Sequence, residues 1–117
     1  MSYMLMVVEP RGQRKERPDV QGRAVYDRML RFTQDLQSRG LLMAADSLKS
    51  DSEGARLAIR GGKRTVVDGP FAESKEMVGG FFLLDCKTRE EALRIAGECP
   101  AAEWATIEVR ESGPCYE

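Results

Sequence analysis

The sequence predicts an α+β domain of the ferredoxin-like, split βαβ kind, with a short hairpin inserted before its third principal strand. The spacing of apolar residues predicts, in order along the chain, a strand, a helix, a strand, a hairpin, a strand, a helix and a strand. The two most continuously apolar strands, 3–8 and 80–84, are the first and third principal strands, which occupy the middle of the sheet in this topology. The length of 117 residues favours a single domain, 1–117, with one core.

The first half of the chain predicts a strand, a connection and a long helix. Residues 3–8 are apolar on both alternating faces, which is typical of a strand covered on two sides, and Pro10 ends this strand. The polar stretch 11–19 is expected to be a solvated connection, and a basic binding loop is the alternative. Residues 20–39 change to a helical period and end at Gly40. The apolar stripe of this helix consists of Val25, Met29, Phe32 and Leu36.

The middle of the chain predicts shorter strands. Residues 41–45 form the second principal strand, which leads into a polar loop, 46–54. Residues 55–60 alternate between apolar and polar, the Gly61-Gly62 pair indicates a tight turn, and 64–67 return as the partner strand. We expect one face of this hairpin to be exposed to water.

The last third repeats the strand–helix–strand pattern. Residues 80–84 form the second strand that is apolar on both faces. Thr88 and Glu91 have the spacing of a capping box and open a helix that Pro100 ends. The inward residues of this helix are expected to be Ala92, Leu93, Ile95, Ala96 and Cys99. Residues 106–110 alternate cleanly and predict a half-exposed final strand.

Two helices cover only one face of such a sheet, yet both central strands are apolar on two faces. Leaving four of these side chains in water would forgo roughly 6 to 12 kcal/mol, at about 1.5 to 3 kcal/mol each. A whole domain is stable by only about 5 to 15 kcal/mol. A second copy is the simplest cover, so we expect a homodimer whose sheets pack face to face as a dimeric α/β barrel. Pockets are then expected between each sheet and its helices or at the dimer interface.

The charge balance and the apolar runs exclude several classes of partner. Eighteen basic and 19 acidic residues give a net charge of −1, so no direct binding to nucleic acid or to an anionic membrane is expected. No apolar run approaches the roughly 20 residues of a membrane span, and the run 4–8 is too short for the core of a signal peptide. Cytoplasmic localisation is therefore expected.

The chain contains no histidine, which restricts its chemistry. Serine–histidine and cysteine–histidine nucleophile pairs and imidazole bases are excluded, so acid–base chemistry would use carboxylates, lysine, tyrosine or cysteine. The three cysteines are widely spaced and form no metal-binding motif, so no metal and no cofactor are expected. Cys86 and Cys99 are expected to be buried, and Cys115 is expected to be a thiol of the C-terminal tail.

The segment 66–76 is the strongest candidate for a functional site. Asp68 follows an apolar run and lies in a Gly-Pro turn, where Gly69 and Pro70 would fix the direction of its carboxylate. One interpretation is a turn residue that accepts hydrogen bonds from backbone N–H groups. The other is a pocket carboxylate, partly buried by Val67 and Phe71, that binds a cationic or hydroxylated ligand or acts as a general base.

Other residues of this segment are candidates for ligand binding, namely Gly69, Pro70, Phe71, Glu73 and Lys75. Phe71 fits the core or a dimer contact better than a pocket wall. Glu73 and Lys75 would ring a pocket mouth or pair across a dimer interface, and a solvated loop is the alternative. The Gly79-Gly80 pair admits a ligand or a neighbouring backbone closely, or forms a bulge.

From its Tyr3-Met4-Leu5 opening to its Ile107-Glu108-Val109-Arg110 ending, the chain resembles the YCII-related superfamily, and within it the branch named for a D-G-P-F motif. The most specific part is the string Asp68-Gly69-Pro70-Phe71-Ala72-Glu73-Ser74-Lys75-Glu76, which stands just before Gly79-Gly80-Phe81. The resemblance implies a ferredoxin-like fold that assembles as a dimeric α/β barrel, in agreement with the argument from the sheet faces.

The resemblance implies less about activity. Some members of the superfamily pair a histidine with an aspartate in a pocket; because this chain has no histidine, only Asp68 carries over. The expected function is binding of a small organic ligand near Asp68, with carboxylate-based acid–base catalysis as an open question. Some relatives of the D-G-P-F branch are encoded beside extracytoplasmic-function sigma factors, so a regulatory protein that contacts a sigma factor is the alternative. An oxygenase is a third possibility, by analogy of fold alone.

Overall fold

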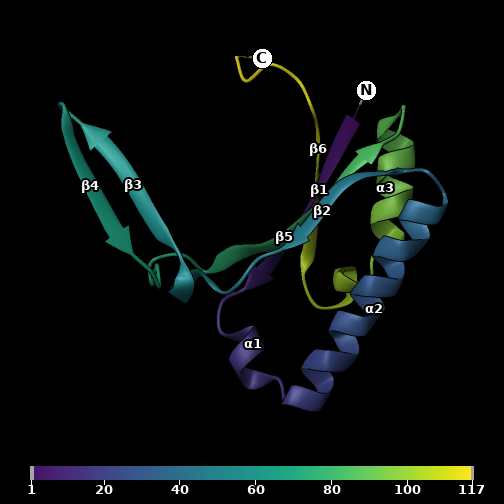
Figure 1. Cartoon of the computed structure of the whole chain (residues 1–117), viewed down its shortest axis with the longest axis horizontal. Helices are drawn as coiled ribbons and strands as arrows, with labels where there is room; N and C mark the ends of the chain where they lie inside the picture. The colour runs from purple at the N-terminus through teal and green to yellow at the C-terminus, as the bar shows by residue number, and fades with distance from the viewer. Residues whose placement is uncertain (1, 117) are drawn as a thin grey trace.

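A four-stranded antiparallel sheet carries helices on one face, and a separate two-stranded hairpin projects from it (Figure 1). The computed structural model describes residues 2–116. The strands are β1 (Ser2–Pro10), β2 (Leu42–Ser47), β3 (Ala55–Arg60), β4 (Lys63–Asp68), β5 (Glu76–Asp85) and β6 (Thr106–Glu111). The helices are α1 (Gln13–Glu16), α2 (Asp19–Ser38) and α3 (Arg89–Glu98), with 3₁₀ turns η1 (Asp51–Glu53) and η2 (Pro100–Glu103).

The order of strands in the sheet is β2-β5-β1-β6, so the two doubly apolar strands lie in its centre, as predicted. In the register of the sheet, Leu5 of β1 stands between Phe82 of β5 and Val109 of β6. This α+β architecture of antiparallel strands and few helices is consistent with a ferredoxin-like fold.

The core lies between the sheet and helices α2 and α3. Tyr3, Leu5 and Val7 alternate with half-buried neighbours along β1 and are themselves buried. Phe82 of β5 faces the same side and meets Phe32 of α2 edge to face, with ring centroids 5.1 Å apart. The period of two in the strands and the helical period of α2 therefore bury a single apolar layer.

Helix α3 begins after the predicted N-cap residue Thr88, although the second bond of the capping box has Lys87 as its donor instead of Thr88. The Thr88 hydroxyl accepts a hydrogen bond from the Glu91 backbone N–H at 3.1 Å, and the Glu91 carboxylate accepts one from the Lys87 N–H at 3.3 Å. Four of the five predicted inward residues are buried. Leu93 was wrongly predicted to point inward: it is 42% exposed, because the helix turns that position away from the sheet.

The two halves of α2 differ in how closely they pack. Phe32 and Leu36, in the C-terminal half of the predicted stripe, are buried against the sheet. Val25 and Met29, in the N-terminal half, are only half-buried. The stripe is thus present as predicted, but its first two members line a hollow instead of filling it.

The second face of the sheet, called the open face here, has no helix on it in residues 2–116 (Figure 1). Its centre consists of Met4, Met6, Val8, Phe81 and Leu83, which are all half-buried. Neighbouring side chains on the face shield one another, so part of the predicted cost of exposure is already avoided within one chain.

The β3–β4 hairpin projects on the side of the sheet away from α2 and α3 (Figure 1). One face of the hairpin was expected to be exposed to water, but both faces are. Leu57 on one face is 54% exposed, and Val67 on the other is 58% exposed. The reason is that the hairpin packs against neither helices nor the sheet along its length, so nothing buries its apolar face.

The connection after β1 is more structured than predicted. It contains the one-turn helix α1, and its arginines reach back to the body of the domain instead of standing in solvent. Arg14 pairs with Glu9 of β1, and Arg11 pairs with Asp51 of η1. The carboxylates of Glu9 and Asp51 lie in the body of the domain, so pairing with them holds the polar stretch 11–19 in place.

None of the helices described in residues 2–116 combines the length and the apolar character that crossing a bilayer requires.

Candidate functional site

A hollow called the α2 pocket here has a volume of about 980 Å³ and lies between α2 and the sheet. Its apolar wall comes from β1, β5, α2 and the residue that follows η2. This wall includes Val7, Val25, Met29, Leu30, Phe82 and Trp104. A hollow between sheet and helices is one of the two positions that the sequence predicted for a pocket.

The buried carboxylate of Glu9 is the central polar group of the α2 pocket. It is 6% exposed and lies on the same face of β1 as the core residues Leu5 and Val7. Arg14 binds it at two points: Nη2 lies 2.6 Å from Oε1, and Nε lies 3.0 Å from Oε2. Two-point pairing of this kind fixes both side chains and offsets the cost of burying the charge.

Arg14 has further hydrogen bonds to backbone carbonyls. Its Nη1 donates to the Leu48 oxygen at 2.8 Å, and its Nη2 approaches the Gly79 oxygen at 3.5 Å. The guanidinium is therefore committed to the protein and joins α1, the end of β2 and β5. Each oxygen of Glu9 accepts one bond from Arg14, and a carboxylate oxygen has a second lone pair that can accept another.

The Gly79-Gly80 pair makes room for this ion pair. The register of β1 and β5 shifts between Val7 and Val8, opposite these glycines, so the bulge alternative is confirmed. A Cβ at Gly79 would stand 1.7 Å from Oε1 of Glu9, and a Cβ at Gly80 would stand 2.9 Å from the Asp46 backbone oxygen. Both positions therefore require glycine for lack of space.

Charged side chains surround the indole of Trp104 at the edge of the α2 pocket. The guanidinium carbons of Arg17 and Arg28 lie 5.8 and 5.6 Å from the ring centroid. Arg28 also donates two hydrogen bonds to the Glu103 carboxylate, at 3.1 and 2.5 Å. These bonds lower the pKa of Glu103 and raise the pKa of Arg28. Both groups are thereby held charged beside Trp104.

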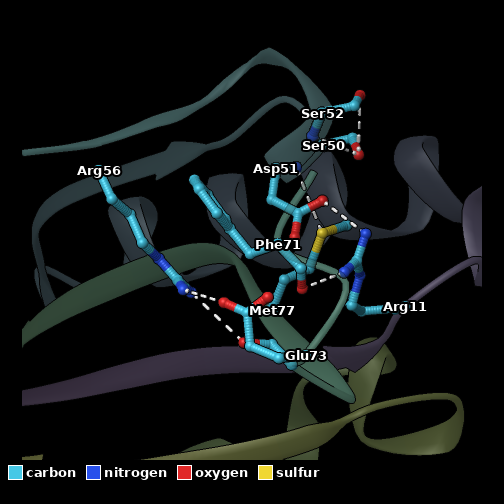
Figure 2. Close-up of polar contacts among 9 residues, drawn as sticks. Arg11, Ser50, Asp51, Ser52, Arg56, Phe71, Glu73 and Met77 are labelled. Carbon is cyan, nitrogen blue, oxygen red and sulfur yellow. Dashed lines mark hydrogen bonds and ion pairs between the residues drawn. The ribbon is translucent and has the colours of Figure 1, made fainter. Parts of the chain in front are cut away.

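The predicted motif forms a second site, called the Phe71 cluster here, which consists of Arg11, Asp51, Arg56, Phe71 and Glu73 (Figure 2). Arg11 donates one hydrogen bond to the Phe71 carbonyl and another to the Asp51 carboxylate, at 3.3 Å. Arg56 lies over the Phe71 ring, 3.8 Å from its centroid, and pairs with Glu73 at 2.9 Å. These contacts hold the base of the hairpin against the body of the domain.

Close backbone contact at Gly69 completes this attachment. The Gly69 N–H donates to the Gly54 carbonyl at 2.8 Å, and a Cβ at Gly69 would stand 1.8 Å from the Asp51 backbone oxygen. The Gly69–Pro70 peptide bond is cis. Asp51 also donates its N–H to the Met77 sulfur, at 3.5 Å (Figure 2). The motif thus joins the end of β4 to η1 and to the start of β5.

Asp68 is exposed, which corrects the expectation of partial burial by Val67 and Phe71. Val67 is itself 58% exposed and points to the other face of β4, so it cannot shield the carboxylate. Within residues 2–116, the Asp68 side chain accepts no hydrogen bond and lines neither hollow. The hydrogen bonds of the turn-capping alternative are therefore not found among the described residues either, and the functional role of Asp68 stays a prediction.

The other predicted ligand-binding residues are divided between roles. Phe71 is 8% exposed and lines a second, shallower hollow of about 530 Å³, together with Asp51, Arg56 and Met77. Glu73 and Lys75 are exposed, and neither lines a hollow. Gly69 and Pro70 also lie outside both hollows, so the structure does not bring the five residues together around one cavity.

Cysteines behave as the sequence predicts. Cys86 and Cys99 are buried and Cys115 is exposed. Burial raises the pKa of both buried thiols. In the part of the chain that the structure describes, no three cysteine, aspartate or glutamate side chains gather as metal ligands would.

Sequence reasoning missed Glu9 and Arg14. A signal was present, because Glu9 continues the alternation of Leu5 and Val7 and therefore falls on the buried face of β1. A buried carboxylate requires a cationic partner, and the basic stretch that follows supplies several. Only the folded chain shows which of them pairs.

Comparison with known proteins places the chain in a family. The chain matches the YCII-related domain over residues 1–113. It is 44% identical over 52 residues to the uncharacterised protein R00369 of Rhizobium meliloti (strain 1021), and this alignment covers 44% of the chain and 42% of that protein. The match to the domain extends over nearly the whole sequence, so the chain belongs to the YCII-related family.

Proposed function

We propose that this protein binds a small organic molecule in the α2 pocket, with an apolar or aromatic body against Phe82 and Trp104 and an amino or hydroxyl group directed at Glu9. The observation that carries the proposal is the buried, fixed carboxylate in the wall of the α2 pocket. Ligand sites typically combine an apolar wall with well-placed polar groups. The α2 pocket has such a wall, and its lining also includes charged side chains of both signs, among them Glu9, Asp46 and Arg23.

The pairing with Arg14 sets the chemistry that Glu9 would offer. An ionised carboxylate held by a guanidinium accepts hydrogen bonds and donates none, so it selects donors such as ammonium or hydroxyl groups. Because Arg14 already donates to Glu9 and to two carbonyls, it has little capacity left for an anionic ligand. At Glu9, the α2 pocket therefore favours amines and alcohols over carboxylic acids.

Trp104 provides a direct test, since it is the single tryptophan of the chain and lines the pocket. Titration with small aromatic amines and alcohols, tyramine and tyrosol among them, should change its fluorescence, whereas the matched acid 4-hydroxyphenylacetate should change it less. Glu9→Gln should weaken binding of the amine by about tenfold, as expected for the loss of a charge-assisted hydrogen bond. Leu30→Glu, at an exposed position of the pocket wall, should weaken binding without unfolding the chain.

Asp68→Asn is the matched control for Glu9→Gln, since both remove one carboxylate. Ligand binding near Asp68, with or without acid–base catalysis, stays a prediction of the sequence. If Asp68→Asn abolishes the response of every compound that binds while Glu9→Gln does not, the site is at Asp68 and the proposal for the α2 pocket is wrong. No fluorescence response from any amine or alcohol would also contradict it.

Homodimerisation through the open face is a second part of the proposal, supported by the apolar side chains that this face leaves half-exposed. Sedimentation of a monomer at micromolar concentration would contradict the predicted dimeric barrel. The D-G-P-F string supports placement in the branch of that name, and contact with a sigma factor stays the alternative function. A pull-down with the protein as bait, followed by identification of a bound sigma factor, would favour that alternative.

A further inference from the structure

Two residues that follow β2, Leu48 and Lys49, line the α2 pocket. Both backbone polar groups of Leu48 are tied to the surroundings of Glu9. The Leu48 N–H donates to the Gly79 carbonyl at 2.9 Å, and the Leu48 carbonyl accepts from Arg14 at 2.8 Å. Lys49 is the next residue, so its flexible four-carbon stem starts close to the Glu9–Arg14 ion pair and its ammonium group can reach a ligand bound there.

The ammonium group of Lys49 has no ion-pair partner in residues 2–116. Its side chain is exposed. Glu53 and Glu76 line the second hollow, which Lys49 also borders, but they are exposed and do not pair with it. Asp46 stands opposite Phe81 in the sheet register and therefore belongs to the open face. The cation of Lys49 thus remains available to a ligand of the α2 pocket.

The remaining cations of the α2 pocket are less suited to bind an anionic group next to the buried carboxylate. Arg23 has Asp19 and Asp27 one helical turn before and after it, and all three line the pocket, so the charge of Arg23 is offset there. Arg17 lies beside the indole of Trp104, 5.8 Å from its centroid. The lysine after β2 is therefore the cation best placed for this role.

The order of strands places Glu9 between Lys49 and Trp104. In the order β2-β5-β1-β6, Lys49 follows β2, Glu9 lies in β1, and Trp104 precedes β6. A ligand with a cationic group at Glu9 can therefore extend a negative group toward one side of the pocket and an apolar body toward the other. An α-amino acid carries an ammonium group, a carboxylate and a side chain on a single carbon atom, which fits these three directions.

We propose that the ligand of the α2 pocket is an α-amino acid with an apolar or aromatic side chain. Its ammonium group binds Glu9, its carboxylate binds Lys49, and its side chain packs against Phe82 and Trp104. This assignment rests on the proposed function, because it keeps the amine that Glu9 selects and adds the acid that Lys49 selects. Lys49 is thereby a specificity-determining residue, which favours an amino acid over the corresponding amine.

Calorimetric titration of the full chain with three phenyl compounds tests the assignment. L-Phenylalanine carries both charged groups, whereas 2-phenylethylamine and L-phenylalaninol keep the amine and lack the carboxylate. L-Phenylalanine should bind about fivefold more tightly than either amine, as expected for one ion pair at a rim open to solvent. Lys49→Met should remove this preference without weakening the binding of the amines, and Lys49→Arg should retain it. Glu9→Gln should weaken the binding of all three compounds.

Lys63→Met is the matched control, because it removes the same charge from the hairpin, at a position that lines neither hollow. This variant should keep the preference for L-phenylalanine. Amines that bind as tightly as L-phenylalanine would overturn the amino acid assignment and leave the proposed function standing. A preference that survives Lys49→Met, or that Arg17→Met removes instead, would overturn the role of Lys49. If none of the three compounds binds, both the assignment and the proposed function are wrong.

Discussion

Glu9 and Arg14 form a two-point ion pair within the sheet layer, and a missing side chain at Gly79 makes the space for it. The distance from Nη2 of Arg14 to Oε1 of Glu9 is 2.6 Å, and a Cβ on Gly79 would stand 1.7 Å from that same oxygen. The bulge opposite Val7 and Val8 brings the glycine to this position. Strand, helix and bulge therefore act together to place one carboxylate in the wall of the α2 pocket.

Gly79→Ala should destabilise the protein by roughly 1 to 3 kcal/mol, since the new methyl group must displace a buried and paired carboxylate. Urea unfolding measures the change. The matched control is Gly97→Ala in α3, where a Cβ meets nothing within 4 Å, and where higher helix propensity should stabilise the chain by about 0.5 to 1 kcal/mol. Equal effects of the two substitutions would contradict the proposed crowding at Glu9.

Gly69→Ala should release the base of the hairpin. The added Cβ would stand 1.8 Å from the oxygen of Asp51, a backbone atom that cannot rotate aside as the end of a side chain could. Faster amide hydrogen exchange is therefore expected throughout residues 55–68, with little change in the central strands. Gly113→Ala, where a Cβ meets nothing within 4 Å, is the control. Unchanged exchange in the hairpin of the Gly69 variant would show that this contact does not anchor it.

Glu103→Gln should make the free energy of unfolding depend less on pH in the acid range. Hydrogen bonds from Arg28 lower the pKa of Glu103 below its ordinary value of 4.5. A carboxylate with a lowered pKa contributes stability above pH 4.5 and loses that contribution as the pH falls through its folded value. The free energy of unfolding of the wild type should thus fall more steeply below pH 4.5 than that of the variant. Glu16→Gln, at an exposed position without an ion pair among the described residues, should keep the wild-type slope.

Thiol reactivity should separate one cysteine from the other two. Cys115 is exposed and should react with Ellman's reagent at the rate of a free thiol, and Cys115→Ser should remove this fast phase. Burial raises the pKa of Cys86 and Cys99 above 9.0, which keeps them as unreactive neutral thiols. Cys86 and Cys99 should react only when the protein unfolds. Because the folded pKa is the higher one, their contribution to stability is present below pH 9.0 and is lost as the pH rises through the folded value.

The sequence by itself determined the strands, the helices α2 and α3 and the two central positions in the sheet. These follow from patterns of period two or 3.6 along a continuous segment, as in Tyr3, Leu5 and Val7 or Phe32 and Leu36. The sequence also indicated that Gly79 and Gly80 mark a close approach, because glycine in a strand has few other uses. It left two interpretations of Asp68 open, a turn residue that binds backbone N–H groups and a pocket carboxylate that follows an apolar run.

Only the tertiary structure decided which carboxylate is buried. Asp68 is exposed because the hairpin that carries it projects from the body of the domain. Glu9 is buried beside Gly79, where the bulge in β5 and the missing side chain leave room for its carboxylate. Both outcomes depend on contacts between segments far apart in the chain. The partner of Glu9 was equally undetermined, since several arginines follow β1 and the position of α1 selects Arg14.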